Sequence, residues 1–218
     1  TPVFSKNGLV TTIAWGLNGK VYYALEGSVF ICGAAVQWLR DGLGLVQHAA
    51  ETEEIAATVS DSGGVYFVPA FVGLGAPYWD PYARGSISGL TRGTTRAHVV
   101  RAVLDSMAFQ TYDVLALMQS ESGITFDALN VDGGASANNL LLKIQADLLG
   151  KKVLRPSCIE TTALGAAYLA GLGVGAISST SSIISNRMVD TIVDSDMDIL
   201  KRMSLINDWH KAVDRSRG

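Results

Sequence analysis

The chain has 218 residues, of which 48% are hydrophobic and 17% charged, and its formal net charge is −3 with a pI near 5.6. This composition predicts a folded globular protein with ample chain for a core, and it excludes a mainly disordered one. The weak negative charge argues against nucleic acid and anionic membranes as main partners, and no apolar run is long enough to span a bilayer.

The first part of the chain predicts a β-hairpin followed by a helix. Residues 10–15 and 20–25 are β-rich runs, and the Asn18-Gly19 pair that joins them is the strongest short hairpin signal. Ser28 is placed to N-cap a helix that continues to about Asp41.

The middle of the chain predicts short strands and one long helix. Residues 51–64 are polar, with one short helix and a terminal Gly-Gly turn, and 65–71 and 86–90 are strand-like runs. Thr94 or Thr95 caps the longest helix, which is expected to reach about residue 122 because its apolar residues recur near helical spacing.

The segment after this helix carries a strand, two glycines and another helix. Residues 128–131 form an apolar strand that ends at Asp132, and the chain turns through Gly133-Gly134 into a helix over about 136–149. Glycines let the backbone approach a ligand, and a helix N-terminus favours an anion such as phosphate. The pattern indicates a nucleotide site, and the alternative is an ordinary strand-to-helix turn.

The last part of the chain is less regular. A strand is expected over 152–155, and an Ala/Gly-rich, closely packed helix over 161–172. The Ser-rich stretch 178–182 opens a polar tail, in which a helix over 198–215 is expected. The acidic residues of the tail predict a solvated surface, and they are Asp190, Asp194, Asp196 and Asp198.

The order of these elements predicts the fold class. A hairpin followed by alternating β and α units gives an α/β domain with a mixed sheet flanked by helices. This is the plan of the ribonuclease H-like fold shared by actin-like ATPases. We expect one such domain over 1–177 and a divergent tail over 178–218.

Four segments together resemble one family. They are Gly33-Ala-Ala-Val-Gln-Trp-Leu-Arg-Asp41, the loop over 69–85, the pair 85–90 and 98–105, and Asp132-Gly-Gly-Ala-Ser-Ala-Asn-Asn139. The set is similar to the glycerol kinases, which are sugar kinases of the actin-like ATPase superfamily. The sequence Gly75-Ala-Pro-Tyr-Trp-Asp-Pro81 narrows the match from sugar kinases in general to the glycerol kinases. The resemblance covers about 5–177, and beyond it only 209–213 and Arg215 match the family's final helix.

The resemblance implies a nucleotide-side, C-terminal domain of a two-domain enzyme. It implies that ATP or ADP is contacted by residues of the glycine turn and approached from a facing helix. These residues are Gly134 and Asn138, with Gly133 and Asp132 as weaker candidates, and Gly33 and Gln37 on the helix. The implied role of Asp132 is to position Mg²⁺-bound phosphate.

Each of these residues also has a structural interpretation. Gln37 is then a solvated helix residue, Gly33 a helix-packing contact and Asn138 the N-cap of its own helix. Asp132 would accept hydrogen bonds from the turn.

The implied reaction is transfer of the γ-phosphate of Mg-ATP to glycerol, giving glycerol 3-phosphate. No residue of this chain matches the family's catalytic Asp, and the Gly-Thr-Gly phosphate turn is not here, so no catalytic residue is assigned. The N-terminus begins at Thr1-Pro2 without Met or a leader. We therefore expect this chain to be part of a longer enzyme and to be inactive alone. The resemblance also implies that the full-length enzyme is a homo-oligomer.

Two other functions stay open. The first is a kinase for another polyol or sugar, because substrate contacts lie outside this chain. The second is a non-catalytic actin-like module that binds nucleotide or oligomerises. A dinucleotide-binding Rossmann domain is disfavoured by the hairpin opening and the lack of a Gly-x-Gly-x-x-Gly turn.

Several other residues receive structural assignments. The aromatic cluster Tyr78, Trp79 and Tyr82 fits a Pro-fixed structural loop better than a sugar-stacking surface. His98 is assigned to helix capping, and Arg84 to a surface ion pair rather than a phosphate contact. Cys32 and Cys158 have no metal-ligand spacing, so they are expected to be buried free thiols in a reducing, cytoplasmic setting.

Overall fold

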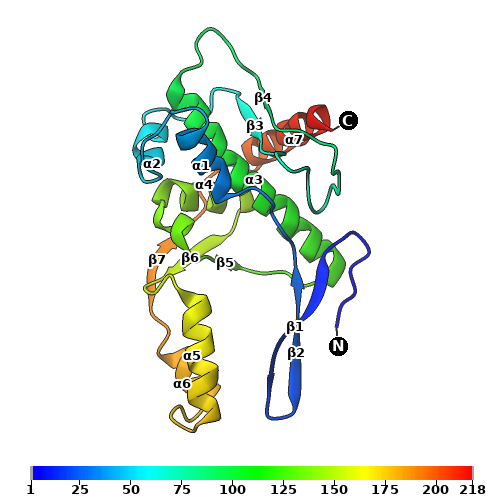
Figure 1. Ribbon diagram of the computed structural model, residues 1–218, viewed down its shortest axis with the longest axis vertical. Coiled ribbons are helices and arrows are strands. Elements are labelled where there is room, and N and C mark those ends of the chain that lie inside the picture. Colours follow the sequence, from blue (N-terminus) through cyan, green and yellow to red (C-terminus); the bar gives the residue numbers. More distant parts are fainter. Residues whose placement is uncertain (1, 218) are drawn as a thin grey trace. The chain divides into compact units, whose positions relative to one another are not determined.

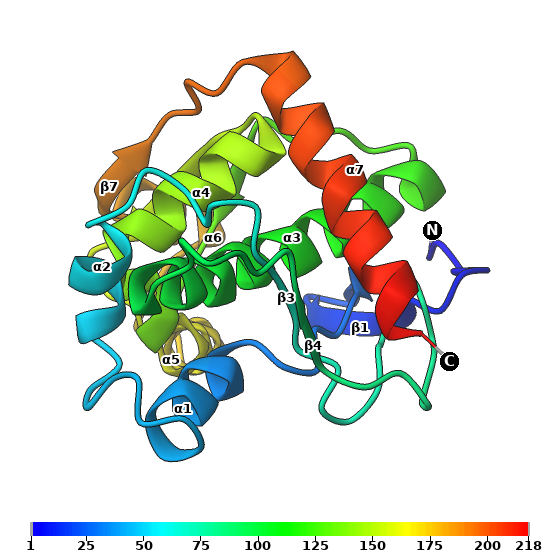
Figure 2. The same cartoon turned by 90° about the horizontal axis from the view of Figure 1, so that it is seen from above.

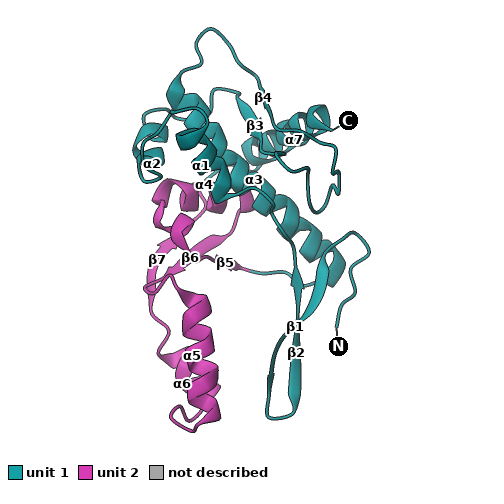
Figure 3. Cartoon of the chain, in the orientation of Figure 1, with its two compact units in different colours: residues 1–126, 197–218 teal, residues 127–196 magenta. Residues whose placement is uncertain are grey.

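The computed structural model describes residues 2–217 and divides into two compact units (Figure 3). Unit 1 comprises residues 1–126 and 197–218, and unit 2 comprises residues 127–196. Within residues 2–217, no helix is both long enough and apolar enough to cross a membrane.

Unit 1 begins with the predicted hairpin, a long two-stranded ribbon (Figure 1, blue). Strands β1 (Val10–Leu17) and β2 (Lys20–Glu26) pair in antiparallel register. Asn18 and Gly19 have φ values of 51° and 75°. Two successive positive φ values match the right-handed twist of the flanking strands, so the Asn-Gly prediction is confirmed.

Helix α1 (Gly33–Asp41) begins later than predicted. Ser28 is not its N-cap, because the preceding residues are held in an irregular connection by tertiary packing. Val29 packs on the cluster of Leu9, Ala76 and Val114, and Ile31 is buried. Those apolar contacts outweigh the local capping signal.

The short helix predicted within 51–64 is α2 (Glu51–Ala56), and two short strands follow it. Strands β3 (Tyr66–Val68) and β4 (Ser86–Ser88) pair in antiparallel register and are shorter than the apolar runs that contain them. Pro69 follows β3 directly and lacks the N–H needed to continue the ladder.

Helix α3 (Arg96–Ser122) organises the core of unit 1 and contacts α1, α2 and β3. Thr95 is its N-cap, as predicted, and Gly123 ends it with a φ of 67°. Helix α7 (Ile199–Ser216) belongs to the same unit, and Figure 2 shows it (red) beside α3 (green). Phe109 of α3 stacks on Trp209 of α7 with ring centroids 5.1 Å apart.

Unit 2 contains a three-stranded mixed sheet in the order β5-β6-β7. Strands β5 (Ala128–Asn130) and β6 (Lys152–Pro156) are parallel, and β7 (Val189–Val193) is antiparallel to β6. Helix α4 (Asn139–Leu149) packs on this sheet through a core cluster of Leu142, Ala146 and Val153. The mixed α/β character predicted from the sequence is confirmed.

The tail has more structure than predicted. Helix α6 (Thr180–Ser185) and strand β7 lie within it, and β7 completes the sheet of unit 2. Its acidic residues are exposed but engaged: Asp190 pairs with Arg155, Asp194 with Lys152, Asp196 with Lys143, and Asp198 caps α7. The predicted solvated surface is confirmed, because all four residues are exposed, but their ion pairs and the cap of α7 were not predicted.

Helix α5 (Thr161–Gly173) forms as predicted but is not closely packed, because none of its residues is buried. The prediction of two buried thiols is also wrong. Cys32 is half-buried and Cys158 is exposed, and both are free. Burial raises the pKa of the Cys32 thiol. Cys158 itself lines a surface groove of unit 2, which the sequence could not distinguish from a core.

Candidate functional site

The candidate site in unit 2 is the turn from Asp132 to Asn138, which follows strand β5. Gly133 has φ 75° and ψ 176°, a backbone conformation that residues other than glycine rarely adopt. Its N–H donates to the carbonyl of Ile159 at 2.9 Å. Ser136 is buried, and both its N–H (3.1 Å) and its hydroxyl (2.7 Å) donate to the Gly133 carbonyl. These bonds hold the turn in one shape.

The helix predicted over 136–149 is divided in two. A short 3-10 helix covers Gly134–Ala137, and α4 starts at Asn139. Between them Asn138 is extended, with φ −81° and ψ 106°, and its side-chain oxygen accepts the N–H of Leu141 at 2.9 Å. The capping role of Asn138 is therefore confirmed, and its amide group lies at the start of α4.

The backbone above the two glycines is open. A Cβ atom added at Gly133 or at Gly134 would meet no atom of the described chain within 4 Å. The N–H groups of Gly134 and Ala135 begin the 3-10 helix and so have no acceptor within it. The turn can therefore be approached closely by a ligand.

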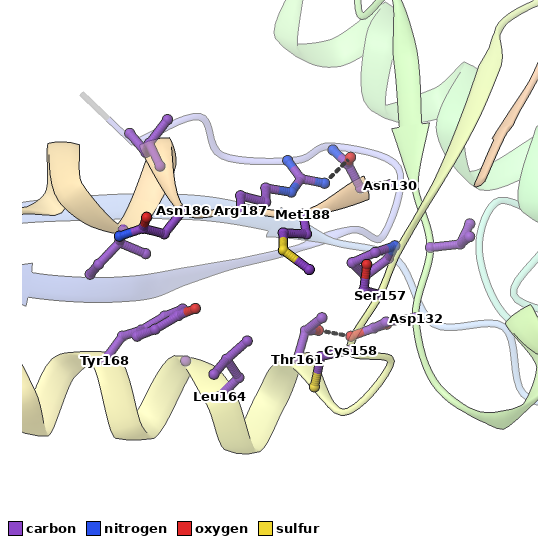
Figure 4. A pocket seen from close by; sticks show the side chains of 15 residues that line it. Asn130, Asp132, Ser157, Cys158, Thr161, Leu164, Tyr168, Asn186, Arg187 and Met188 are labelled. Carbon is purple, nitrogen blue, oxygen red and sulfur yellow. Dashed lines mark hydrogen bonds between the residues drawn. The ribbon is translucent and has the colours of Figure 1, made fainter. Parts of the chain in front are cut away.

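A groove of about 650 Å³ adjoins the turn at Asp132 (Figure 4). Residues of α5 line it, including Leu164 and Tyr168, together with the exposed Cys158. The Thr161 hydroxyl, at the start of α5, donates a hydrogen bond to the Asp132 carboxylate. Asp132 thus accepts a hydrogen bond, although from α5 rather than from its own turn.

The two remaining candidates lie on α1 in unit 1. Gly33 is the first residue of the helix and Gln37 follows one turn later, so both share one exposed face. A Cβ at Gly33 would meet nothing within 4 Å among the described atoms, so a helix-packing contact does not explain this glycine. The structure brings Asp132, Gly133, Gly134 and Asn138 together in one unit, and Gly33 with Gln37 in the other.

The loop over 73–81 has the structural features that were assigned to it. Leu74 and Asp80 exchange backbone hydrogen bonds of 2.8 and 3.1 Å. The Tyr78 hydroxyl donates to the buried Asp113 at 2.8 Å, and Trp79 packs edge-on against Phe30. Burial and the nearby Asp113 raise the pKa of Tyr78.

The outcomes for His98 and Arg84 differ. Nδ1 of His98 accepts the backbone N–H of Thr95 at 3.1 Å, so the capping role is confirmed. Arg84 instead donates to the carbonyl oxygens of Pro81 and Ala83, and within residues 2–217 it forms no ion pair. The predicted ion pair was wrong because loop carbonyls lie within closer reach.

One residue near the turn was not predicted from the sequence. The guanidinium of Arg155, on β6, donates to the Ser136 carbonyl at 3.0 Å. The available signal was an arginine inside the predicted strand over 152–155, three residues after Lys152.

A resident metal centre is not formed by the described part of the chain. No group of three or more His, Cys, Asp or Glu residues within 2–217 is arranged to hold a metal ion. Asp132 offers one carboxylate beside the turn. Since Mg²⁺ commonly uses one or two carboxylates together with waters and substrate phosphates, this donor fits an ion that arrives with a nucleotide.

Comparisons with known proteins identify the family of the chain. Residues 1–174 match the model of the C-terminal domain of the FGGY family of carbohydrate kinases. Glycerol kinase 2 of Thermotoga maritima is 61% identical over 214 residues, which is 98% of this chain and 43% of that protein. The chain thus spans less than half the length of such relatives.

Solved structures show the same likeness. The glycerol kinase of Plasmodium falciparum, determined with ADP, is 39% identical over 98% of this chain and 43% of that one, with a TM-score of 0.92. A xylulose kinase from Rhodospirillum rubrum, 22% identical over 97% of this chain and 42% of that one, has a TM-score of 0.79 and supports the fold alone. The predicted sugar-kinase fold is confirmed.

Proposed function

The chain belongs to the FGGY family of carbohydrate kinases, and we propose that it is the nucleotide-binding part of a glycerol kinase. The parent enzyme would transfer the γ-phosphate of ATP to a hydroxyl of glycerol, giving ADP and glycerol 3-phosphate in the cytoplasm. The observation that carries the proposal is the open, internally braced turn over 132–138, in a chain 61% identical to a glycerol kinase.

The residues of the turn have the chemistry that nucleotide binding needs. Gly133 and Gly134 leave the backbone clear, so a nucleotide can lie directly against it. The Asn138 amide offers a donor as well as the oxygen that caps α4. On α1 of unit 1, Gly33 and Gln37 are proposed as nucleotide contacts in their own right, because Gly33 leaves the backbone clear and Gln37 supplies both a donor and an acceptor.

The phosphates would extend toward Asp132, the first residue of the turn and its one carboxylate. Mg²⁺ bound to those phosphates supplies charge neutralisation during phosphoryl transfer. Asp132 would hold a water or the ion itself. The Thr161 hydroxyl fixes the direction of the carboxylate by donating to it.

Phosphoryl transfer also needs a group that positions the attacking hydroxyl. No residue of this chain is assigned that role, so we propose that the remainder of the longer protein supplies it. The purified 218-residue chain should then fail to phosphorylate glycerol, which a coupled ADP-release assay measures. Turnover above the rate without protein would contradict this part of the proposal.

Calorimetric titration of the chain with ADP and Mg²⁺ tests the nucleotide site. Asn138→Ala removes both the amide and the cap, whereas Asn138→Ser keeps a capping oxygen and removes the amide. We expect saturable binding by the unsubstituted chain, weakened in both variants. Unchanged binding by Asn138→Ser would show that Asn138 is only a cap, and no binding by the unsubstituted chain would contradict a preformed site.

A further inference from the structure

Arg155 uses its whole guanidinium group to connect three segments of unit 2. Nη1 donates to the Ser136 carbonyl and to Asn139 Oδ1, both at 3.0 Å. Nη2 donates to Asp190 Oδ2 at 2.9 Å and to Thr191 Oγ1 at 2.7 Å, and Nε donates to Asp190 Oδ2 at 3.2 Å. The side chain is only 15% exposed. Such a fork-shaped set of charged bonds fixes both direction and distance.

A bulge in β7 makes this arrangement possible. Arg155 pairs with Thr191 across the β6–β7 ladder, whereas the next residue, Pro156, pairs with Val189. Asp190 is therefore the extra residue of the bulge. In a regular strand the side chains of residues 190 and 191 would point to opposite faces, but here both contact Arg155.

On the side of the guanidinium away from β7, Nη1 holds the 3-10 helix. Ser136 is the residue whose N–H and hydroxyl fold back onto the Gly133 carbonyl, so its own carbonyl is the outward end of the turn. Arg155 therefore binds the backbone before Asn138, at the Ser136 carbonyl, and the side chain that follows it, at Asn139 Oδ1.

We propose that Arg155, anchored by Asp190 and Thr191, is the positioning residue that holds the turn over 133–138 in its nucleotide-binding shape. The inference rests on the proposed function, because it takes the turn to be the nucleotide site, and it assigns no contact between Arg155 and the nucleotide itself. Because Arg155 connects β7 directly to the turn, displacement of β7 would also change the affinity for the nucleotide.

The test compares Arg155→Lys and Asp190→Ala with Lys152→Ala. Lysine has one nitrogen and cannot reach both the turn and β7, and Asp190→Ala leaves Arg155 without its charged anchor. Lys152→Ala is the matched control, because Lys152 of β6 forms an ion pair of 3.0 Å with Asp194, the residue that follows β7. Among the described residues, no ion pair or hydrogen bond of the Lys152 side chain reaches the turn.

Hydrogen–deuterium exchange of each variant reports on the turn without any nucleotide. We expect faster exchange in the peptide over 132–141 for both test variants, unchanged exchange over 143–149, and no change in Lys152→Ala. Faster exchange throughout unit 2 would mean that Arg155 only stabilises the fold. Unchanged exchange over 132–141 would overturn the proposal.

Titration with ADP and Mg²⁺ then measures the functional consequence. Arg155→Lys should bind about tenfold more weakly, the loss expected for about one charge-assisted hydrogen bond, while Lys152→Ala binds normally. Binding equal to the unsubstituted chain would contradict the positioning role while leaving the nucleotide site in place. If the unsubstituted chain binds no ADP, the proposed function fails, and the exchange result still decides whether Arg155 orders the turn.

Discussion

Trp209 Nε1 donates a 2.8 Å hydrogen bond to Oδ2 of Asp113, although 96 positions separate the two residues in the sequence. The same oxygen accepts the Tyr78 hydroxyl at 2.8 Å, and Oδ1 lies 2.9 Å from His210 Nε2. Asp113 is on α3, Trp209 and His210 are on α7, and Tyr78 is in the loop over 73–81. One buried carboxylate therefore fastens the terminal helix and the loop to the central helix of unit 1.

Replacement of this carboxylate should destabilise the fold. Asp113→Ala leaves the Tyr78 hydroxyl and the Trp209 N–H without their acceptor in a buried site, so we expect the free energy of unfolding to fall by about 3 kcal/mol. Urea denaturation measures this loss. Asp208→Ala is the control, because the 2.8 Å pair of Asp208 with Lys211 is exposed and should contribute less than about 0.5 kcal/mol. Equal losses in the two variants would contradict the assigned role of Asp113.

The same cluster predicts a pH dependence of stability. The hydrogen bond to Asp113 raises the pKa of His210 above 6.5, burial opposes this, and the charges of Asp113 and Asp214 add to the rise. Because the folded-state pKa is the higher one, the stabilisation is complete below pH 6.5 and is lost as the pH rises through the folded-state pKa.

Comparison of the chain with His210→Gln over pH 6 to 9 checks this sign. The stability advantage of the unsubstituted chain should shrink as the pH rises. Its size should be about 0.5 kcal/mol, since the half-exposed imidazole is screened by solvent. An advantage that is constant, or that grows with pH, would show that protonated His210 does not stabilise the fold.

The elements that were predicted correctly depend on neighbouring residues. The Asn18-Gly19 turn fixes its hairpin, and Thr95 with His98 fixes the start of α3. Each signal acts within three residues, so a single sequence is sufficient to identify it.

The elements that were missed depend on distant partners. Helix α1 starts at Gly33 because Val29 and Ile31 pack in unit 1, and β7 forms because β6 offers an edge. The ion pairs of the exposed acidic residues of the tail were missed, because Arg155 and the lysines that pair with them are far away in sequence. Among the site residues, the sequence therefore indicated the glycines of the turn and missed Arg155, whose role exists only after folding.

The two glycines of the turn should respond differently to substitution by alanine. Gly133, with φ 75° and ψ 176°, occupies a region that is essentially confined to glycine, so Gly133→Ala should cost about 1 to 3 kcal/mol of folding free energy. Gly134 has no positive φ and has open space around it, so Gly134→Ala should fold as stably as the unsubstituted chain. Urea denaturation of both variants measures this difference.

Gly134→Ala should weaken nucleotide binding even though it leaves the stability of the fold unchanged. The added methyl group would project into the space where the proposed nucleotide lies against the backbone, so ADP should bind more weakly although stability is retained. Calorimetric titration with ADP and Mg²⁺ at a temperature well below the unfolding transition measures the effect. If Gly134→Ala binds ADP with full affinity, the nucleotide lies away from this glycine. If Gly134→Ala loses as much stability as Gly133→Ala, the space around Gly134 is filled in solution.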